Sequence, residues 1–270
     1  MAGLHLWLAG VALLIHSPAS HPIVVREARH RLAGRPTLSG RPDQEASPVA
    51  DAREALPADE LKPLLRGRLH QAAFFAAIPA AVVLVAVAPT TVARVAGTVY
   101  AASLVGLYGS SAAYHRLRWS RRALQRMKRL DHSMIFVLIA GTYTPFSLLV
   151  LHGAWSVAIL ATVWAGAAVG VGLKLLRIDG MRLVTGALYG TLGWPAILTA
   201  PQAVRGMSPT ALGLLIAGGL MYTVGAVVLA RRRPDPSPRV FGYHEIWHSF
   251  VVAAGACQYA AILLVMLGAR

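Results

Sequence analysis

The chain has 270 residues, of which 56% are hydrophobic and 14% are charged, and its mean hydropathy is +0.56. This composition is typical of proteins that cross a membrane several times. The single cysteine, Cys257, excludes an internal disulfide framework and a cysteine-rich zinc finger. The net charge of +15 does not indicate nucleic-acid binding, because the basic residues lie in short clusters between apolar runs.

Residues 1–60 differ in composition from the rest of the chain. They contain seven of the eleven acidic residues and a tract rich in proline, arginine and alanine. From about residue 17 this segment has too few large apolar residues to bury a core, so we expect it to be disordered. The opening MAGLHLWLAGVALLIHSPAS resembles a signal peptide but lacks its basic n-region, which favours a cytosolic tail or an over-extended start. The sequence therefore predicts a disordered extension over 1–60 and one membrane domain over 61–270.

Seven apolar segments follow this extension, each close to the roughly 20 residues that a helix needs to cross a bilayer. Pro79, Pro145 and Pro195 fall inside these segments, and membrane helices tolerate proline better than soluble helices do. The sequence therefore predicts an all-α fold, a multi-pass protein of the cell membrane built as a bundle of seven transmembrane helices. The expected spans are residues 69–88, 92–114, 132–151, 154–174, 183–203, 210–230 and 245–267.

Lysine and arginine residues near the span ends indicate the orientation, because cytosolic loops carry an excess of them. Seventeen lie before the first span or after the second, fourth and sixth, whereas the other side has only Arg94, Arg205 and Arg270. We therefore expect the N-terminus in the cytosol and the C-terminus outside. The seventeen are Lys62, Arg66, Arg68, Arg116, Arg118, Arg121, Arg122, Arg126, Lys128, Arg129, Lys174, Arg177, Arg182, Arg231, Arg232, Arg233 and Arg239.

Four ionisable side chains lie at span ends that this topology places in the cytosol. His115 ends the second span, Asp131 precedes the third, and His244 and His248 begin the seventh. Titratable groups are costly in a membrane and are therefore functional candidates. His244 and His248 are four residues apart, which places both imidazoles on one helix face where they can share an ion.

Three neutral histidines with a water in the fourth position form the pattern of an open, catalytic zinc site. Ser111 lies one turn before His115 on the same face, and Asp131 is a candidate to hold the water or to orient a ligand. Two simpler interpretations stay open: Ser111 bonds to its own helix backbone, and Asp131 caps a helix. The remaining histidines of interest are interpreted as membrane-interface residues, namely His70, His132 and His152.

The segment HEIWH at 244–248 matches the H-E-x-x-H pattern of zinc metalloproteases, in which the glutamate is the general base. Glu245 lies about 100° around the helix from His244 and need not face the ion, so we assign it no catalytic role. Asp179, in the sequence IDG, resembles the aspartate motif of intramembrane site-2 proteases. In that family the aspartate motif follows the histidine motif, whereas here it precedes it. An intramembrane metalloprotease is therefore a disfavoured alternative.

Three blocks of the chain resemble the hemolysin III family, which belongs with the progestin and adipoQ receptors and the alkaline ceramidases. They are SSAAYHRLRWSRRALQRMKRLDHSMIFVLIAGTYTPF (110–146), ALYGTLGWPAILTAP (187–201) and FGYHEIWHSFVVAAGACQYAAILL (241–264). The resemblance covers about residue 62 to the end. It implies a seven-helix bundle with zinc bound by the residues at 115, 244 and 248. It also implies that Ser111 and Asp131 lie close to that zinc, and that the glutamate of HEIWH is incidental.

The function that these features favour is a zinc-dependent hydrolase of lipid amides or esters at the cytosolic membrane face. The metal would activate a water, Asp131 would act as its base, and Ser111 would donate to the developing oxyanion. A membrane-lytic protein and a membrane sensor or receptor with a structural zinc remain alternatives. The expected partners are membrane lipids and a zinc ion, without nucleic acid, and the sequence does not give the oligomeric state.

Overall fold

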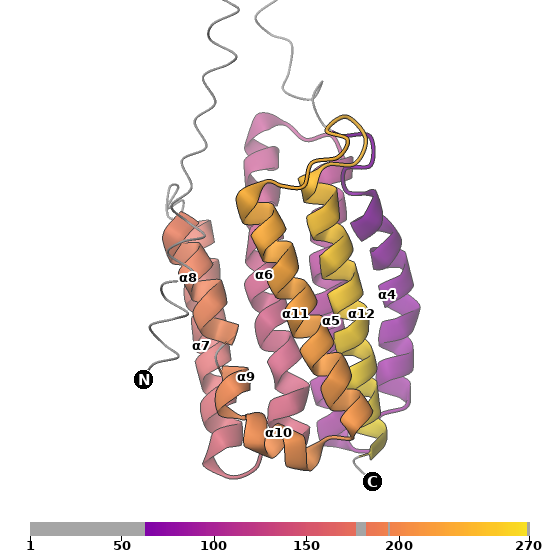
Figure 1. Cartoon of the computed structure of the whole chain (residues 1–270), viewed down its shortest axis with the longest axis vertical. Coiled ribbons are helices and arrows are strands. Elements are labelled where there is room, and N and C mark those ends of the chain that lie inside the picture. Colours follow the sequence, from indigo (N-terminus) through magenta and orange to yellow (C-terminus); the bar gives the residue numbers. More distant parts are fainter. Residues whose placement is uncertain (1–62, 177–181, 194, 269–270) are drawn as a thin grey trace, which may run out of the picture. The chain divides into compact units, whose positions relative to one another are not determined.

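The computed structural model describes residues 63–176, 182–193 and 195–268. The expected extension over 1–60 lies outside these residues. Six long helices run alongside one another as a bundle (Figure 1), and each is long and apolar enough to cross a membrane. The all-α, multi-pass membrane fold is therefore confirmed at the level of six candidate spans. The six are α4 (Arg68–Ala86), α5 (Thr91–Arg116), α6 (Arg121–Leu149), α7 (Ala154–Leu175), α11 (Pro209–Arg231) and α12 (Tyr243–Gly268).

Helices that follow one another in sequence pack side by side. Helix α4 packs on α5, α5 on α6, α6 on α7, and α11 on α12. The last helix, α12, also contacts α4, α5 and α6, so it closes the bundle against the first described helix. This closing contact brings the starts of α4 and α12 to the end of the bundle at which α5 finishes (Figure 1).

The helix expected over 183–203 is interrupted in the structure. Three short helices occupy this region: α8 (Arg182–Gly193), α9 (Pro195–Leu198) and α10 (Ala200–Gly206). Residue 194, between α8 and α9, lies outside the described residues, and the chain turns at Thr199 between α9 and α10. Tyr143 holds this region to α6: its hydroxyl donates to the Gly193 carbonyl and accepts from the Ala196 N–H, each at 3.1 Å.

Helix α6 begins eleven residues before the expected span at 132. Its first turns are rich in arginine and too polar for an apolar-run prediction to include. Ser120 sets this start, because its hydroxyl accepts a hydrogen bond from the Ala123 N–H at 3.4 Å. Asp131 consequently lies well inside a helix and does not cap one, so that simpler interpretation was wrong.

The residues just before α4 are tied to the connection between α11 and α12. The Leu64 N–H donates to the Arg239 carbonyl at 3.0 Å, and the Leu65 N–H donates to the Val240 carbonyl at 3.2 Å. Gly67 then starts α4 with a φ of 76°, a conformation that glycine adopts without strain. A Cβ on Gly67 would lie 2.6 Å from the Cβ of His115, so the absence of a side chain allows α4 to approach the end of α5.

Candidate metal centre

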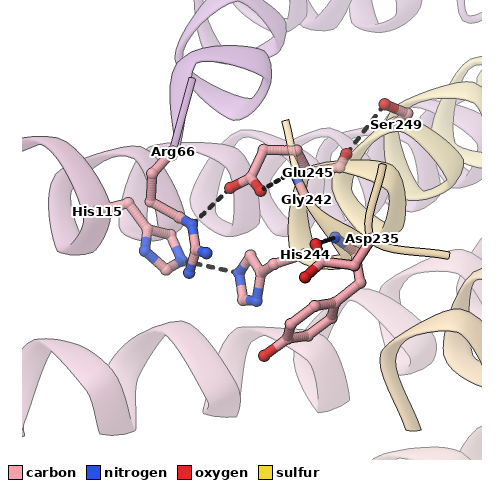
Figure 2. Close-up of polar contacts among 8 residues, drawn as sticks. Arg66, His115, Asp235, Gly242, His244, Glu245 and Ser249 are labelled. Atoms are coloured by element: carbon pink, nitrogen blue, oxygen red, sulfur yellow. Dashed lines mark hydrogen bonds and ion pairs between the residues drawn. The ribbon is translucent and has the colours of Figure 1, made fainter. Parts of the chain in front are cut away.

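Three histidines from two helices meet at this end of the bundle. His115 lies in the last turn of α5, and His244 and His248 lie in the first two turns of α12. One ring nitrogen from each lies within 4.8 Å of the others. The Nε2 atoms of His115 and His244 are 3.3 Å apart and face each other in Figure 2. Only 3% of His248 is exposed, and the other two are partly buried.

This arrangement fits a metal ion by distance and by donor type. Two ligands at 2.0–2.1 Å from a tetrahedral zinc are about 3.3 Å apart, which is the separation of His115 and His244. Imidazole nitrogens suit zinc, copper, iron and nickel. Among the described residues the cluster holds histidines only. The expected ligand set is therefore brought together as a cluster that can hold a metal ion.

Ser111 and Asp131 form a pair beside this cluster. Ser111 is buried on α5, one turn before His115, and the Asp131 carboxylate on α6 lies within hydrogen-bonding reach of its hydroxyl. Ser111 therefore faces a partner on another helix. The pair places a carboxylate next to the helix face that carries His115, outside the cluster of ligand atoms.

Glu245 is buried, with 1% of its surface exposed, and it faces a cation. Its Oε1 accepts from the Arg66 Nε at 2.5 Å, and its Oε2 accepts from the Gly242 N–H at 3.0 Å (Figure 2). The second bond satisfies a backbone donor at the start of α12. A carboxylate held in this way ties the start of α12 to the residue before Gly67. Asp179, the other protease-like residue, lies outside the described residues.

Sequence reasoning missed the partner of Glu245. Arg66 precedes α4, and 21% of its side chain is exposed; Figure 2 shows its bond to Glu245. A signal was present, because Glu245 is the only glutamate after residue 60. A glutamate buried in a membrane domain requires a cationic partner, and basic residues at the start of a neighbouring span are the natural candidates.

His70 is a second residue that the sequence placed wrongly. It was expected at the membrane interface, but only 3% of it is exposed and its ring stacks on His248 with centroids 3.8 Å apart. The cause is the closing contact of α12 with α4, which no local pattern reveals. His152, by contrast, is exposed, and its backbone N–H donates to the side-chain Oε1 of Gln202 at 2.9 Å. His132 is partly buried on α6.

Comparisons with known proteins give the family of the chain. Residues 59–259 match the family described as Haemolysin-III related. The chain is 32% identical over 193 residues to hemolysin-3 of Bacillus cereus, covering 70% of this chain and 85% of that protein. It is 31% identical over 166 residues to the hemolysin-3 homolog of Bacillus subtilis (strain 168), covering 62% and 75%. It is also 28% identical over 174 residues to the human monocyte to macrophage differentiation factor, covering 63% and 69%. The chain therefore belongs to the Haemolysin-III related family.

Proposed function

We propose that this member of the Haemolysin-III related family is a zinc-dependent hydrolase of lipid amides or esters that works at the cytosolic face of the membrane. One observation carries the proposal: three histidines that can share an ion lie beside a serine–aspartate pair. Three nitrogen ligands leave the fourth position of a tetrahedral zinc open to solvent or substrate, as in catalytic sites. Zinc bound there would supply Lewis acidity, which polarises a carbonyl group and makes a coordinated water more acidic.

The chain's own residues would manage the protons of the reaction. Asp131 would accept a proton from the attacking water and return it to the amine or alcohol that leaves. Ser111 would hold the Asp131 carboxylate in place through the hydrogen bond that joins them. Once Asp131 carries the proton it no longer needs that bond, so the Ser111 hydroxyl would be able to donate to the developing oxyanion.

We also propose that the chain crosses the membrane seven times with its N-terminus in the cytosol. The segment α8–α10 supports this, since it lies between α7 and α11 in the chain and runs along the bundle before α11 begins (Figure 1). The seventeen-to-three bias of basic residues supports the orientation. With this topology the histidines lie at the cytosolic face, where a lipid can reach them from one leaflet.

The experiment that tests the activity compares the lipids of cells that carry the wild type, His248→Ala or His152→Ala. His152→Ala is the matched control. It removes an exposed histidine that lies between α6 and α7, far in sequence from the cluster. We expect amide- or ester-linked lipids to accumulate in His248→Ala relative to both other strains. Identical lipid profiles in all three strains would reject the hydrolase and favour a sensor with a structural metal.

Membrane lysis is a second candidate, and the printed name of the Bacillus cereus relative, hemolysin-3, favours it. The purified chain would then release a dye from liposomes of a single lipid species that has no amide bond. Lysis that is equal for the wild type and His248→Ala would support a lytic activity independent of the histidine cluster. Lysis that is lost in His248→Ala would instead indicate that the leakage follows from lipid hydrolysis.

A further inference from the structure

His70 lies near the start of α4 between two aromatic rings. Its ring stacks on the ring of His248, with centroids 3.8 Å apart and planes 10° apart. On another side the ring of Tyr108 lies 5.2 Å away, tilted by 55°. Both ring nitrogens of His70 are buried without a hydrogen-bond partner among the described residues. Buried polar atoms are nearly always paired, so a histidine kept here without partners requires an explanation.

The stacked geometry separates His70 from the three candidate ligands. Histidine binds a metal along a direction that lies in the plane of its ring. Because the rings of His70 and His248 are nearly parallel, with centroids 3.8 Å apart, their nitrogens do not converge on one ion at 2.0–2.1 Å. The group of mutually close ligand atoms accordingly contains His115, His244 and His248. His70 therefore leaves the fourth position of the ion open.

We propose that His70 is a positioning residue of the metal centre, which holds the ring of His248 by stacking and does not bind the ion. This inference rests on the metal site of the proposed function and adds a residue from a third helix to it. A bound metal withdraws electron density from the imidazole that ligates it, so the face of a neutral ring against that imidazole is attracted to it. The same contact fixes the direction in which His248 presents its nitrogen.

The fold around α4 keeps His70 in this position. Gly67 allows α4 to start in direct contact with His115. The Arg66–Glu245 ion pair then ties the residue before Gly67 to α12. Tyr108 lies against the His70 ring on α5. The ring of His70 is thus placed by contacts to the two helices that carry the ligands, which is the arrangement expected of a residue that orients one of them.

Two substitutions separate the ring face of His70 from its nitrogens. Phenylalanine keeps an aromatic face, and it costs the protein no hydrogen bond because no described residue bonds to the His70 nitrogens. Alanine removes the face as well. We would measure the zinc affinity of the purified full chain in detergent by competition with a chelator. His152→Ala serves as the matched control.

We expect His70→Ala to bind zinc about 10–100-fold more weakly than the wild type, the usual cost of removing a residue that orients a ligand. His70→Phe and the His152→Ala control should bind zinc like the wild type. The absorption spectrum of the cobalt-loaded protein reports the ligand geometry directly. It should change in His70→Ala and keep the wild-type shape in His70→Phe. If the alanine variant does not fold, His70→Leu takes its place, because leucine fills the space without an aromatic face.

Each other outcome overturns the inference. Wild-type affinity and spectrum in His70→Ala would reduce His70 to packing. Weak binding in His70→Phe as well as in His70→Ala would show that the nitrogens act, as a ligand or as a hydrogen-bonding group. A wild-type chain that takes up no zinc would reject the proposed metal centre together with this inference. The thermal unfolding of each metal-free variant distinguishes a lost metal from a lost fold.

Discussion

The two ends of the helix bundle use their polar side chains differently. At the end where α12 begins, some polar side chains bond to partners that are far away in the sequence, beside local caps such as that of Ser120. Arg66 and Glu245 are 179 residues apart, and His115 and His244 are 129 residues apart. The partners come from different helices, so their meeting depends on how the whole bundle packs.

At the opposite end, most polar side chains serve the backbone close to them. Thr90 accepts from the N–H of residue 93 at 3.1 Å, and Ser208 accepts from the N–H of residue 211 at 3.2 Å. Thr199 donates to the Pro195 carbonyl at 2.9 Å, one turn away. These bonds cap or continue helices, and they account for their residues fully.

The difference indicates which polar groups in a membrane bundle are candidates for function. A side chain that satisfies a neighbouring helix end stabilises the fold and needs no further role. A cluster of titratable side chains that converges from different helices at a cost in desolvation, as His115, His244 and His248 do, is a candidate for function. The end of the bundle that carries His115, His244 and His248 fits this description. The predictions below test whether these residues have a function beyond stability.

The largest effect is expected from Asp131→Asn. Removing the proposed base should lower lipid turnover by about 10²–10⁴-fold. The zinc content should stay at the wild-type level, because Asp131 lies outside the ligand cluster. Mass spectrometry of released fatty acids and elemental analysis of the same preparation measure the two quantities. The control is Asp235→Asn, which neutralises an exposed carboxylate at the same end. Full turnover in Asp131→Asn would show that Asp131 is not the catalytic base.

Glu245→Gln should act on stability. It removes the charge that faces Arg66, and we expect the free energy of unfolding to fall by about 2–3 kcal/mol, because water reaches part of Arg66 and limits the loss. Thermal unfolding in detergent measures this effect, and zinc should still bind. A glutamate that acts as the base of a metalloprotease would give the reverse result: an unchanged melting temperature with turnover abolished.

Gly67→Ala and Gly153→Ala form a matched pair across the two ends. Both glycines have a positive φ, 76° and 62°, and the backbone cost of alanine is about 1 kcal/mol in the left-handed region of Gly67 and about 1–3 kcal/mol at Gly153, whose ψ of −145° suits essentially glycine alone. A Cβ at Gly67 would also press on His115, whereas a Cβ at Gly153 meets open space. We therefore expect Gly67→Ala alone to weaken zinc affinity in chelator competition. Equal zinc affinity in the two variants would show that the start of α4 does not shape the site.

The smallest effect is expected from deleting residues 1–60. No proposed ligand or span lies in this segment, so insertion into the membrane and zinc content should both match those of the full chain. Membrane fractionation followed by elemental analysis provides the measurement. A truncated chain that loses its metal would show that residues 1–60 contribute to the metal site.

Much of the helical fold could be predicted from apolar runs alone. The expected second and seventh spans differ from α5 and α12 by two residues or fewer at each end. The start of α6 was missed because its arginine-rich turns are not apolar. That start is set by a specific partner, the Ser120 hydroxyl.

The site was predictable only where sequence spacing fixes geometry. The i,i+4 spacing of His244 and His248, and the alternation of spans, placed three histidines at one end of the bundle. His70 and the Arg66–Glu245 pair were missed because they depend on α12 packing against α4. Hydropathy gives the number and direction of spans, but it carries no information on which helices become neighbours.

The most direct test of the central claim is the zinc content of purified His115→Ala, measured by elemental analysis against the wild type and His152→Ala. His115 is the ligand that the first half of the chain contributes, so the site exists only if α5 and α12 share one ion. We predict that His115→Ala loses most of its zinc, because two remaining histidines hold the metal poorly, while His152→Ala keeps the wild-type amount. Full zinc occupancy in His115→Ala would contradict the proposed site, whatever the activity of the variant.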